Sequence, residues 1–117
     1  NEAYFVERDQ QALNTLRANI QKLGFLDTTT VLAGSVENIT RWAYPPADVV
    51  FCDAPYTNNV TSQAIQNIAR IGAIQQGALV IIEMPKKDEM TLPYEFKFAD
   101  KRIYGISSIH LFNWKPF

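Results

Sequence analysis

A stretch near the middle of the chain carries the residues best suited to chemistry. The apolar run Val49–Cys52 is followed at once by Asp53, Ala54, Pro55 and Tyr56. An apolar run with β-branched residues is typical of a strand buried on both faces of a parallel sheet. Proline forces the residue before it out of helical geometry, so the chain should turn directly after the strand. We therefore expect the acid and the tyrosine at the carboxyl end of a central strand, the edge where open α/β sheets bind ligands.

This short segment resembles the Asp/Asn/Ser-Pro-Pro-Tyr/Phe motif of S-adenosylmethionine-dependent enzymes that methylate exocyclic amino groups of bases, with Ala54 in place of the first proline. An amine conjugated to a ring is a poor nucleophile and needs acceptors that turn its lone pair toward the methyl group. The resemblance implies that the Asp53 carboxylate and the Ala54 carbonyl are these acceptors. Pro55 would fix the turn, and Tyr56 would stack on the base, a contact worth about 1–3 kcal/mol. A strand-terminating turn with a half-buried tyrosine is the alternative.

The composition is that of one ordinary globular domain. The 117 residues are 47% hydrophobic and 20% charged, and they hold no apolar run of the length that crosses a membrane. A net charge of −1 does not indicate a nucleic-acid-binding protein, although it does not exclude a local basic patch. The single cysteine, Cys52, lies in the expected strand and excludes an internal disulfide framework. We therefore expect one cytoplasmic domain over residues 1–117, with no membrane association.

The chain opens with a strand and a helix. Residues 3–7 form the expected strand, which ends at Glu7, and Asp9 is a suitable N-cap for a helix through Leu23. Gly24 is placed to close that helix. In α/β folds that bind dinucleotides or adenosyl groups, an acid at the end of this strand accepts hydrogen bonds from ribose hydroxyls. A solvated glutamate at a strand end is the alternative for Glu7.

Strands and helices then alternate with short links. Residues 29–33 form the next expected strand, and a short helix is expected from Val36 to Trp42. After the central strand come a helix at about residues 60–71 and an apolar strand at residues 78–83. This order favours right-handed crossovers and a parallel sheet.

The last third of the chain follows a different pattern. Aromatic and charged residues alternate over residues 94–98, which is typical of a half-exposed strand. The strand is expected to continue past a bulge to Tyr104, and Gly105 allows a tight turn into a strand at residues 106–114. His110 lies in that last strand without a partner at metal-ligand spacing, so we interpret it as structural.

Assembled in order, these elements resemble class I methyltransferases and, among them, the RsmD family of 16S rRNA guanine-N2 methyltransferases. The stretches that carry the likeness are Phe5-Val6-Glu7-Arg8-Asp9 with Leu16, Asn19 and Leu23-Gly24, then Asp48–Tyr56, Val80–Glu83 and Lys101–Gly105. The resemblance implies a Rossmann-like α/β fold, mostly parallel, with a C-terminal antiparallel hairpin. The first strand of that class and its glycine-rich loop have no counterpart in residues 1–117. We therefore expect an N-terminal segment or a second chain to complete the sheet.

The resemblance also implies roles for individual residues. Glu7 would hold the ribose of S-adenosylmethionine, Ser35 and Val36 would lie at its adenine, and Asp53 would face both the cofactor and the guanine amine. The family usually has an aspartate where Ser35 stands, and a hydroxyl accepts a weaker hydrogen bond than a carboxylate. No metal is implied.

The expected function is methyl transfer from S-adenosylmethionine to an exocyclic amine of an RNA base, with guanine N2 of small-subunit ribosomal RNA as the target. The expected partner is ribosomal RNA or a small-subunit assembly particle. A DNA adenine-amino methyltransferase would share the same chemistry, and a non-catalytic remnant of the fold would act as a binding module. The sequence leaves both alternatives open. Four basic residues are candidates for phosphate contacts, with a solvated rim as the alternative for each: Lys86, Lys87, Lys101 and Arg102.

Overall fold

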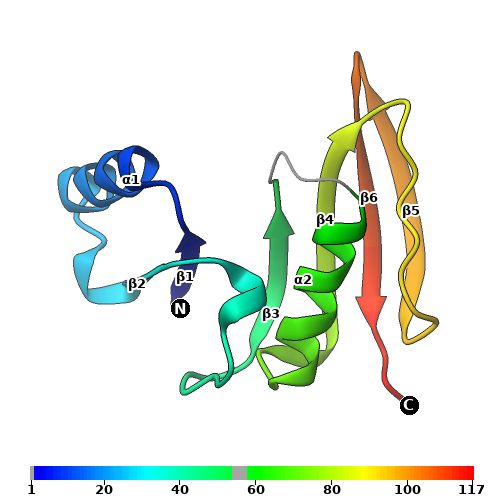
Figure 1. The fold of residues 1–117 in the computed structure, drawn as a ribbon, viewed down its shortest axis with the longest axis horizontal. Helices are drawn as coiled ribbons and strands as arrows, with labels where there is room; N and C mark the ends of the chain where they lie inside the picture. Colours follow the sequence, from blue (N-terminus) through cyan, green and yellow to red (C-terminus); the bar gives the residue numbers. More distant parts are fainter. Residues whose placement is uncertain (1, 54–57) are drawn as a thin grey trace. The chain divides into compact units, whose positions relative to one another are not determined.

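The computed structural model describes residues 2–53 and 58–117. These residues form two compact units, one that ends at Ile39 and one that spans Thr40–Phe117 (Figure 1). Each unit has its own sheet: two strands in the first and four in the second.

The first unit is a parallel strand pair with one long helix. β1 (Ala3–Glu7) pairs in parallel with β2 (Thr29–Ala33). They are joined through α1 (Gln10–Leu23) and the 3₁₀ turn η1 (Leu26–Thr28). The bounds predicted for these two strands and for the helix are confirmed.

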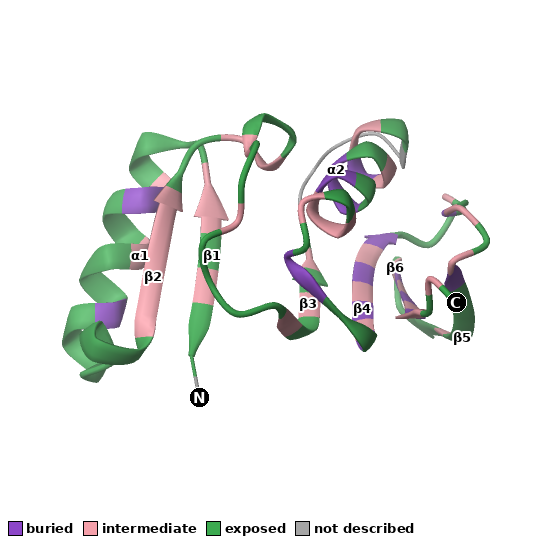
Figure 2. Ribbon diagram, turned by 90° about the horizontal axis from the view of Figure 1, so that it is seen from below, coloured by how far each residue is buried: buried purple, intermediate pink, exposed green. Residues whose placement is uncertain are grey.

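Both ends of α1 are closed by the residues that the sequence indicated. The Asp9 carboxylate accepts a hydrogen bond from the Ala12 backbone N–H at 2.8 Å, which satisfies one of the free donors of the first turn. Gly24 ends the helix at φ 78°, a left-handed conformation that costs glycine nothing. Leu13 and Ile20 are the buried residues of this helix (Figure 2).

The segment after β2 differs from the prediction. A 3₁₀ turn, η2 (Val36–Asn38), replaces the helix that was expected to reach Trp42. Ile39 is already extended, with φ −76° and ψ 119°. Local contacts hold the following residues instead, since the Trp42 indole N–H donates to the Pro45 carbonyl at 3.2 Å. The β-branched Ile39 lowers helix propensity, and so short a helix gains too few hydrogen bonds to offset its nucleation.

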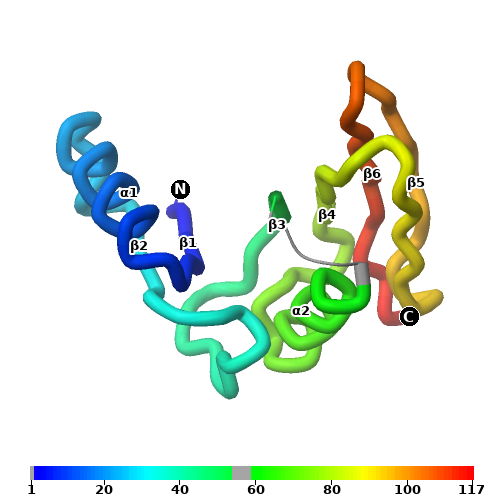
Figure 3. Tube along the Cα trace, turned by 45° about the horizontal axis from the view of Figure 1, so that its top comes forward, coloured from blue at the N-terminus to red at the C-terminus, as the bar shows by residue number. Residues whose placement is uncertain are grey.

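The second unit is a four-stranded mixed sheet with one helix. Its strand order is β3 (Ala47–Cys52), β4 (Ile74–Pro85), β6 (Ser107–Trp114) and β5 (Phe96–Tyr104). β3 and β4 are parallel, whereas β6 runs antiparallel to both of its neighbours. Figure 3 shows β6 between β4 and β5. Helix α2 (Asn58–Arg70) precedes β4 in the chain.

The predicted C-terminal antiparallel hairpin is confirmed. β5 and β6 are joined by a turn in which Gly105 has φ 59°, and the register of β5 shifts between Phe98 and Asp100. That shift is the expected bulge. The strand predicted at residues 78–83 is also present, but β4 extends beyond it at both ends because its pairing with β3 and β6 begins earlier and ends later.

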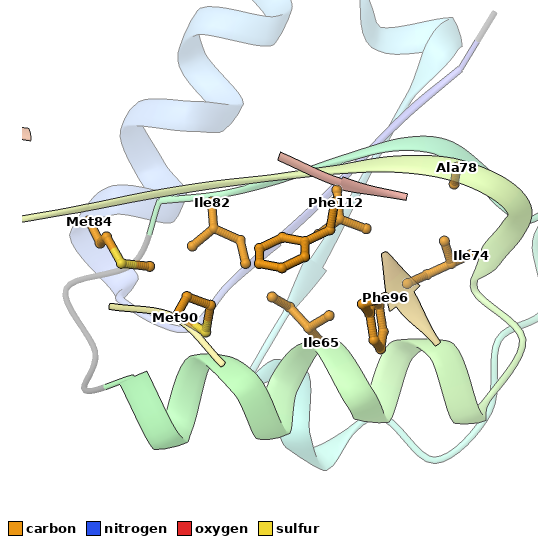
Figure 4. Close-up of a cluster of buried hydrophobic side chains, with 9 residues drawn as sticks. Ile65, Ile74, Ala78, Ile82, Met84, Met90, Phe96 and Phe112 are labelled. Atoms are coloured by element: carbon orange, nitrogen blue, oxygen red, sulfur yellow. The ribbon is translucent and has the colours of Figure 1, made fainter. Parts of the chain in front are cut away.

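The core of the second unit lies between α2 and one face of the sheet (Figure 4). Ile65 of α2 is 1% exposed and points toward Ile82 of β4, which is also 1% exposed. Burial of one such side chain contributes about 1.5–3 kcal/mol. The other buried members of the cluster are Ile74, Ala78, Val80, Met84, Met90, Phe96 and Phe112.

The opposite face of β3 is open in the described part of this unit. Val50 and Cys52 pack against the core, but Val49 and Phe51 are 58% and 60% exposed. Among the residues described, β3 pairs with β4 alone and is an edge strand. The prediction of a central strand buried on both faces is therefore not met here, because neither a further strand nor a helix of this unit covers that side of β3.

His110 is buried in β6 on the core side of the sheet. It is 2% exposed, and its Nε2 lies 3.1 Å from the hydroxyl oxygen of Ser108, which is fully buried. Burial lowers the pKa of His110 below its usual range; the positive charge of Lys101 lowers it further, and Glu89 opposes this. These contacts suit a neutral structural histidine.

This histidine should make stability depend on pH. Because the pKa of His110 is lower in the folded state, the unfolded chain binds more protons below about pH 6.5. The free energy of unfolding should therefore be highest above that pH, as far as His110 determines it, and should fall as the pH drops. Urea unfolding at pH 7.5 and 5.5 measures the effect. In His110→Gln the loss between the two pH values should be smaller than in the wild type. Equal losses in the two proteins would show that His110 is not neutral in the fold.

Candidate active site

Glu7 stands at the carboxyl end of β1 with its carboxylate fixed by the backbone. Its Oε1 accepts hydrogen bonds from the backbone N–H groups of Arg8 and Asp9, both at 3.0 Å. Because both bonds end on Oε1, Oε2 is available as a further acceptor. The sheet edge therefore presents an oriented carboxylate oxygen, which suits the hydroxyls of a ribose.

Ser35 and Val36 follow the neighbouring strand at the same edge. Ala33, the last residue of β2, is the register partner of Glu7, and the Gly34 N–H donates to the Glu7 carbonyl at 2.9 Å. Gly34 has φ 140°, a conformation that favours glycine. The half-buried Ser35 begins η2, but its hydroxyl makes no capping bond there. The structure thus brings Glu7 and Ser35 to one edge, as the prediction for a ribose and adenine site requires.

Asp53 is the corresponding residue in the second unit. It comes directly after Cys52, the last residue of β3, and it is exposed. Its predicted neighbours Ala54, Pro55 and Tyr56 lie outside the described residues, so their roles stay predictions.

A second acid, which the sequence analysis did not assign to the site, accompanies Asp53. Cys52 is the register partner of Ile82, and the next residue on β4 is Glu83. Asp53 and Glu83 therefore lie at the ends of adjacent parallel strands, with their side chains on the same face of the sheet. The negative charge of Asp53 raises the pKa of Glu83 above its usual range, and partial burial and the proximity of the two side chains add to the effect.

The sequence did contain a sign of Glu83. It directly follows the apolar run Val80–Ile82, just as Asp53 directly follows Val49–Cys52. Two acids that each end an apolar strand are brought together only if the strands are parallel neighbours, and the sequence by itself did not specify that pairing.

The four basic residues considered for phosphate contacts differ in their surroundings. Lys101 pairs with Glu89 at 3.1 Å, and Arg102 pairs with Asp100 at 3.0 Å. Arg102 and the Lys101 backbone N–H hold the pKa of Asp100 below its usual range. Lys86 and Lys87 are exposed directly after β4. Because exposed ion pairs are weak, the pairing of Lys101 and Arg102 would not prevent contacts with a polyanion.

Two structural features were not found among the described residues. Across residues 2–53 and 58–117, neither helix is long and apolar enough to span a bilayer. No group of three or more His, Cys, Asp or Glu side chains in this part of the chain is placed to hold a metal ion.

Comparison with known proteins defines the class. A candidate methylase from Haemophilus influenzae superposes with a TM-score of 0.83 at 26% identity, over 97% of this chain and 73% of that one. A candidate methyltransferase from Streptococcus mutans, in complex with SAH, superposes with a TM-score of 0.69 at 13% identity, over 96% and 75% of the two chains. The fold is that of Rossmann-like methyltransferases, with parallel strands and a C-terminal antiparallel pair.

Residues 1–113 match the family described as Conserved hypothetical protein 95, and the chain belongs to this family. The resemblance to the RsmD family is thereby confirmed. The ribosomal RNA small subunit methyltransferase D of Haemophilus influenzae is 26% identical in an alignment of 111 residues that covers 92% of this chain. The chain spans about half the length of its curated relatives, 58% of this one and 56% of a second with the same name.

The proximity of Asp53 to Glu83 should make stability depend on pH. Because the folded state raises the pKa of Glu83, it binds more protons than the unfolded chain above about pH 4.5, and stability should fall as the pH rises through the raised pKa. Glu83→Gln removes the titrating group. The urea midpoint of Glu83→Gln minus that of the wild type should therefore be larger at pH 7.5 than at pH 4.5. A constant difference over this range would mean that Asp53 does not act on Glu83 in solution.

Proposed function

We propose that the protein transfers a methyl group from S-adenosylmethionine to an exocyclic amine of a base in small-subunit ribosomal RNA, with guanine N2 as the acceptor. Asp53 carries this proposal, because it is an acid at the carboxyl end of β3 in a methyltransferase fold. The name of the curated relatives supports ribosomal RNA as the substrate. The cytoplasm is the corresponding compartment, and residues 1–117 would work as one methyltransferase domain.

The proposed reaction requires the protein mainly to orient the acceptor amine toward the methyl group. When bound, S-adenosylmethionine supplies an electrophilic methyl group on a sulfonium. The Asp53 carboxylate would accept an N–H of the amine and turn the nitrogen lone pair toward that methyl group. Ala54, Pro55 and Tyr56 complete this part of the proposal with a carbonyl acceptor, a fixed turn and a stacking surface.

The residues of the first unit fit the cofactor's nucleoside. Glu7 offers Oε2 to the ribose while Oε1 is held by the backbone at 3.0 Å. Ser35 and Val36, at the same edge, would contact the adenine. The SAH complex of the structural relative from Streptococcus mutans is consistent with a nucleoside site in this fold.

Two further features belong to the proposal. β3 has a free edge among the described residues, and an N-terminal segment or a second chain would supply the strand that completes the sheet. Lys86, Lys87, Lys101 and Arg102 would provide phosphate contacts.

The names of the curated relatives favour RNA over a DNA adenine substrate. An assay of methyl transfer separates an enzyme from a non-catalytic binding module.

Replacement of Asp53 should remove activity while leaving cofactor binding largely intact. In the full-length gene product, Asp53→Ala should lower the kcat of tritium transfer from S-adenosylmethionine to small-subunit particles by at least about 100-fold, because the amine loses its orientation. Asp48→Ala, at the other end of β3, is the matched control and should stay within about threefold of wild type. Near-normal transfer by Asp53→Ala would refute the assignment.

Replacement of Glu7 should weaken the cofactor instead. A hydrogen bond to a charged group contributes about 1.5–3 kcal/mol, so Glu7→Ala should raise the Kd for S-adenosylmethionine about 10-fold or more in titration calorimetry. Asp27→Ala changes an exposed acid of the same unit near the start of β2 and should leave the Kd unchanged. An unchanged Kd in Glu7→Ala would place the ribose elsewhere.

A further inference from the structure

One row of residues crosses the sheet of the second unit at the level of Asp53. Asp53 follows β3 beside Glu83 of β4. Glu83 pairs with Ile109 of β6, which pairs in turn with Arg102 of β5. Residues that are paired across a sheet project to the same face, so these four side chains lie on the face opposite helix α2. The row therefore connects the proposed acid of the active site with the β5–β6 hairpin.

The turn of this hairpin lies at the same end of the sheet. β3 and β4 run toward that end, and Figure 1 shows the turn beyond the carboxyl end of β4. Tyr104 comes two residues after Arg102 on β5, so it projects to the same face one row further along. It is 56% exposed, and Ile106 in the turn is 88% exposed. An exposed aromatic ring thus stands next to the row that holds Asp53.

Backbone hydrogen bonds hold the turn in place. The Lys86 N–H donates to the Ile106 carbonyl at 2.7 Å, and the Asp88 N–H donates to the Pro85 carbonyl at 3.0 Å. The exposed residues Lys86 and Lys87 are thereby kept beside the hairpin turn. A surface that is already ordered loses little conformational entropy when it binds a partner.

The charges along the row change from acidic to basic. Asp53 and Glu83 offer acceptors at β3 and β4, which suits the N–H groups of a base, whereas Arg102 offers donors at β5, which suits a phosphate. The Arg102 side chain is 63% exposed, and its ion pair with Asp100 at 3.0 Å is weak in water. A nucleotide strand would thus lie with the target base at β3 and its backbone toward β5.

The width of the row corresponds to a few nucleotides. Adjacent strands lie about 4.8 Å apart, so the three spacings from Asp53 to Arg102 add up to about 14 Å. Stacked nucleotides of one strand advance by about 3.4 Å. The hairpin therefore lies within about four nucleotides of a base held at Asp53.

We propose that the end of the β5–β6 hairpin binds the RNA strand next to the target nucleotide. Tyr104 stacks on a neighbouring base, and Arg102, Lys86 and Lys87 contact phosphates. This inference rests on the proposed function of Asp53, and it adds a binding surface outside the residues that hold the reacting base. Because every base can stack on an aromatic ring, this surface contributes affinity and strand direction more than sequence specificity.

The first test measures methyl transfer by the full-length gene product with tritiated S-adenosylmethionine and small-subunit particles. Tyr104→Ala should raise the KM for the particles about 10-fold with a nearly unchanged kcat, because a stacking contact is lost. Tyr104→Trp keeps an aromatic ring and should stay within about threefold of wild type. The Kd for S-adenosylmethionine should be unchanged in both variants, which a general loss of structure would not allow.

Tyr94→Ala is the matched control. Tyr94 is 76% exposed in the same unit, and it precedes β5 at the end opposite the hairpin turn. Its replacement should leave the KM within about twofold of wild type. Equal increases in Tyr94→Ala and Tyr104→Ala would overturn the inference.

The salt dependence of binding separates the phosphate contacts from the stacking contact. Each phosphate contact to a single strand changes the slope of log K against log [KCl] by about 0.7. In filter binding of the particles, Arg102→Gln should therefore reduce the slope by about 0.7, whereas Tyr104→Ala should weaken binding with the wild-type slope. An unchanged slope in Arg102→Gln would refute its phosphate contact.

Ultraviolet crosslinking of the protein to the particles tests the location. Mass spectrometry should find peptides that contain Tyr104 joined to RNA within about four nucleotides of the methylated base. An increase in KM for Tyr104→Ala without such a crosslink would mean that the hairpin contacts a protein, and would overturn the inference.

Failure of this inference differs from failure of the proposed function. An active wild type with an equally active Tyr104→Ala would overturn the hairpin surface and leave methyl transfer standing. A wild type that shows the crosslink and the Tyr104-dependent binding but transfers no methyl group would overturn the proposed function and support the hairpin as an RNA-binding surface.

Discussion

The parallel pairing of β3 with β4 is the constraint on which the second unit depends. It aligns Val49–Cys52 with Leu79–Ile82 residue by residue, and therefore brings Asp53 and Glu83 to one edge. The same pairing places Val50 beside Val80, on the face that packs against α2. A slip of one residue would turn the apolar side chains away from the core and separate the two acids. Core burial therefore also holds the site in register.

The two faces of β3 differ: one packs against the core, and the other is exposed and leads to Asp53. One face contributes Val50 and Cys52 to the core, which stabilises the strand. Asp53 follows on the face of Val49 and Phe51, which is exposed. A carboxylate kept at the exposed edge retains its charge at little desolvation cost, whereas one on the core face would have to be neutralised. The end of this strand, and not its core face, is therefore the better place for an acid with the proposed role of accepting an N–H.

In the first unit, backbone N–H groups orient an acid at the end of a strand. The N–H groups of Arg8 and Asp9 both contact one oxygen of Glu7, and Asp9 then begins α1 through its own side chain. A single tight turn therefore orients one acid and caps a helix. Because β1 and β2 are also parallel, Ser35 follows at the same edge as Glu7. In both units, the carboxyl ends of parallel strands collect the polar groups that a ligand would need.

The sequence by itself determined the features that depend on neighbouring residues. Helix α1, its caps at Asp9 and Gly24, and the hairpin turn at Gly105 follow from local periodicity and backbone preference. The short helix predicted after β2 was wrong, since Ile39 is extended and local contacts around Trp42 replace it. Only the tertiary structure decided that Glu83 joins Asp53. These residues are far apart in the chain, and only the register of two strands, set by burial against α2, brings their carboxyl groups together.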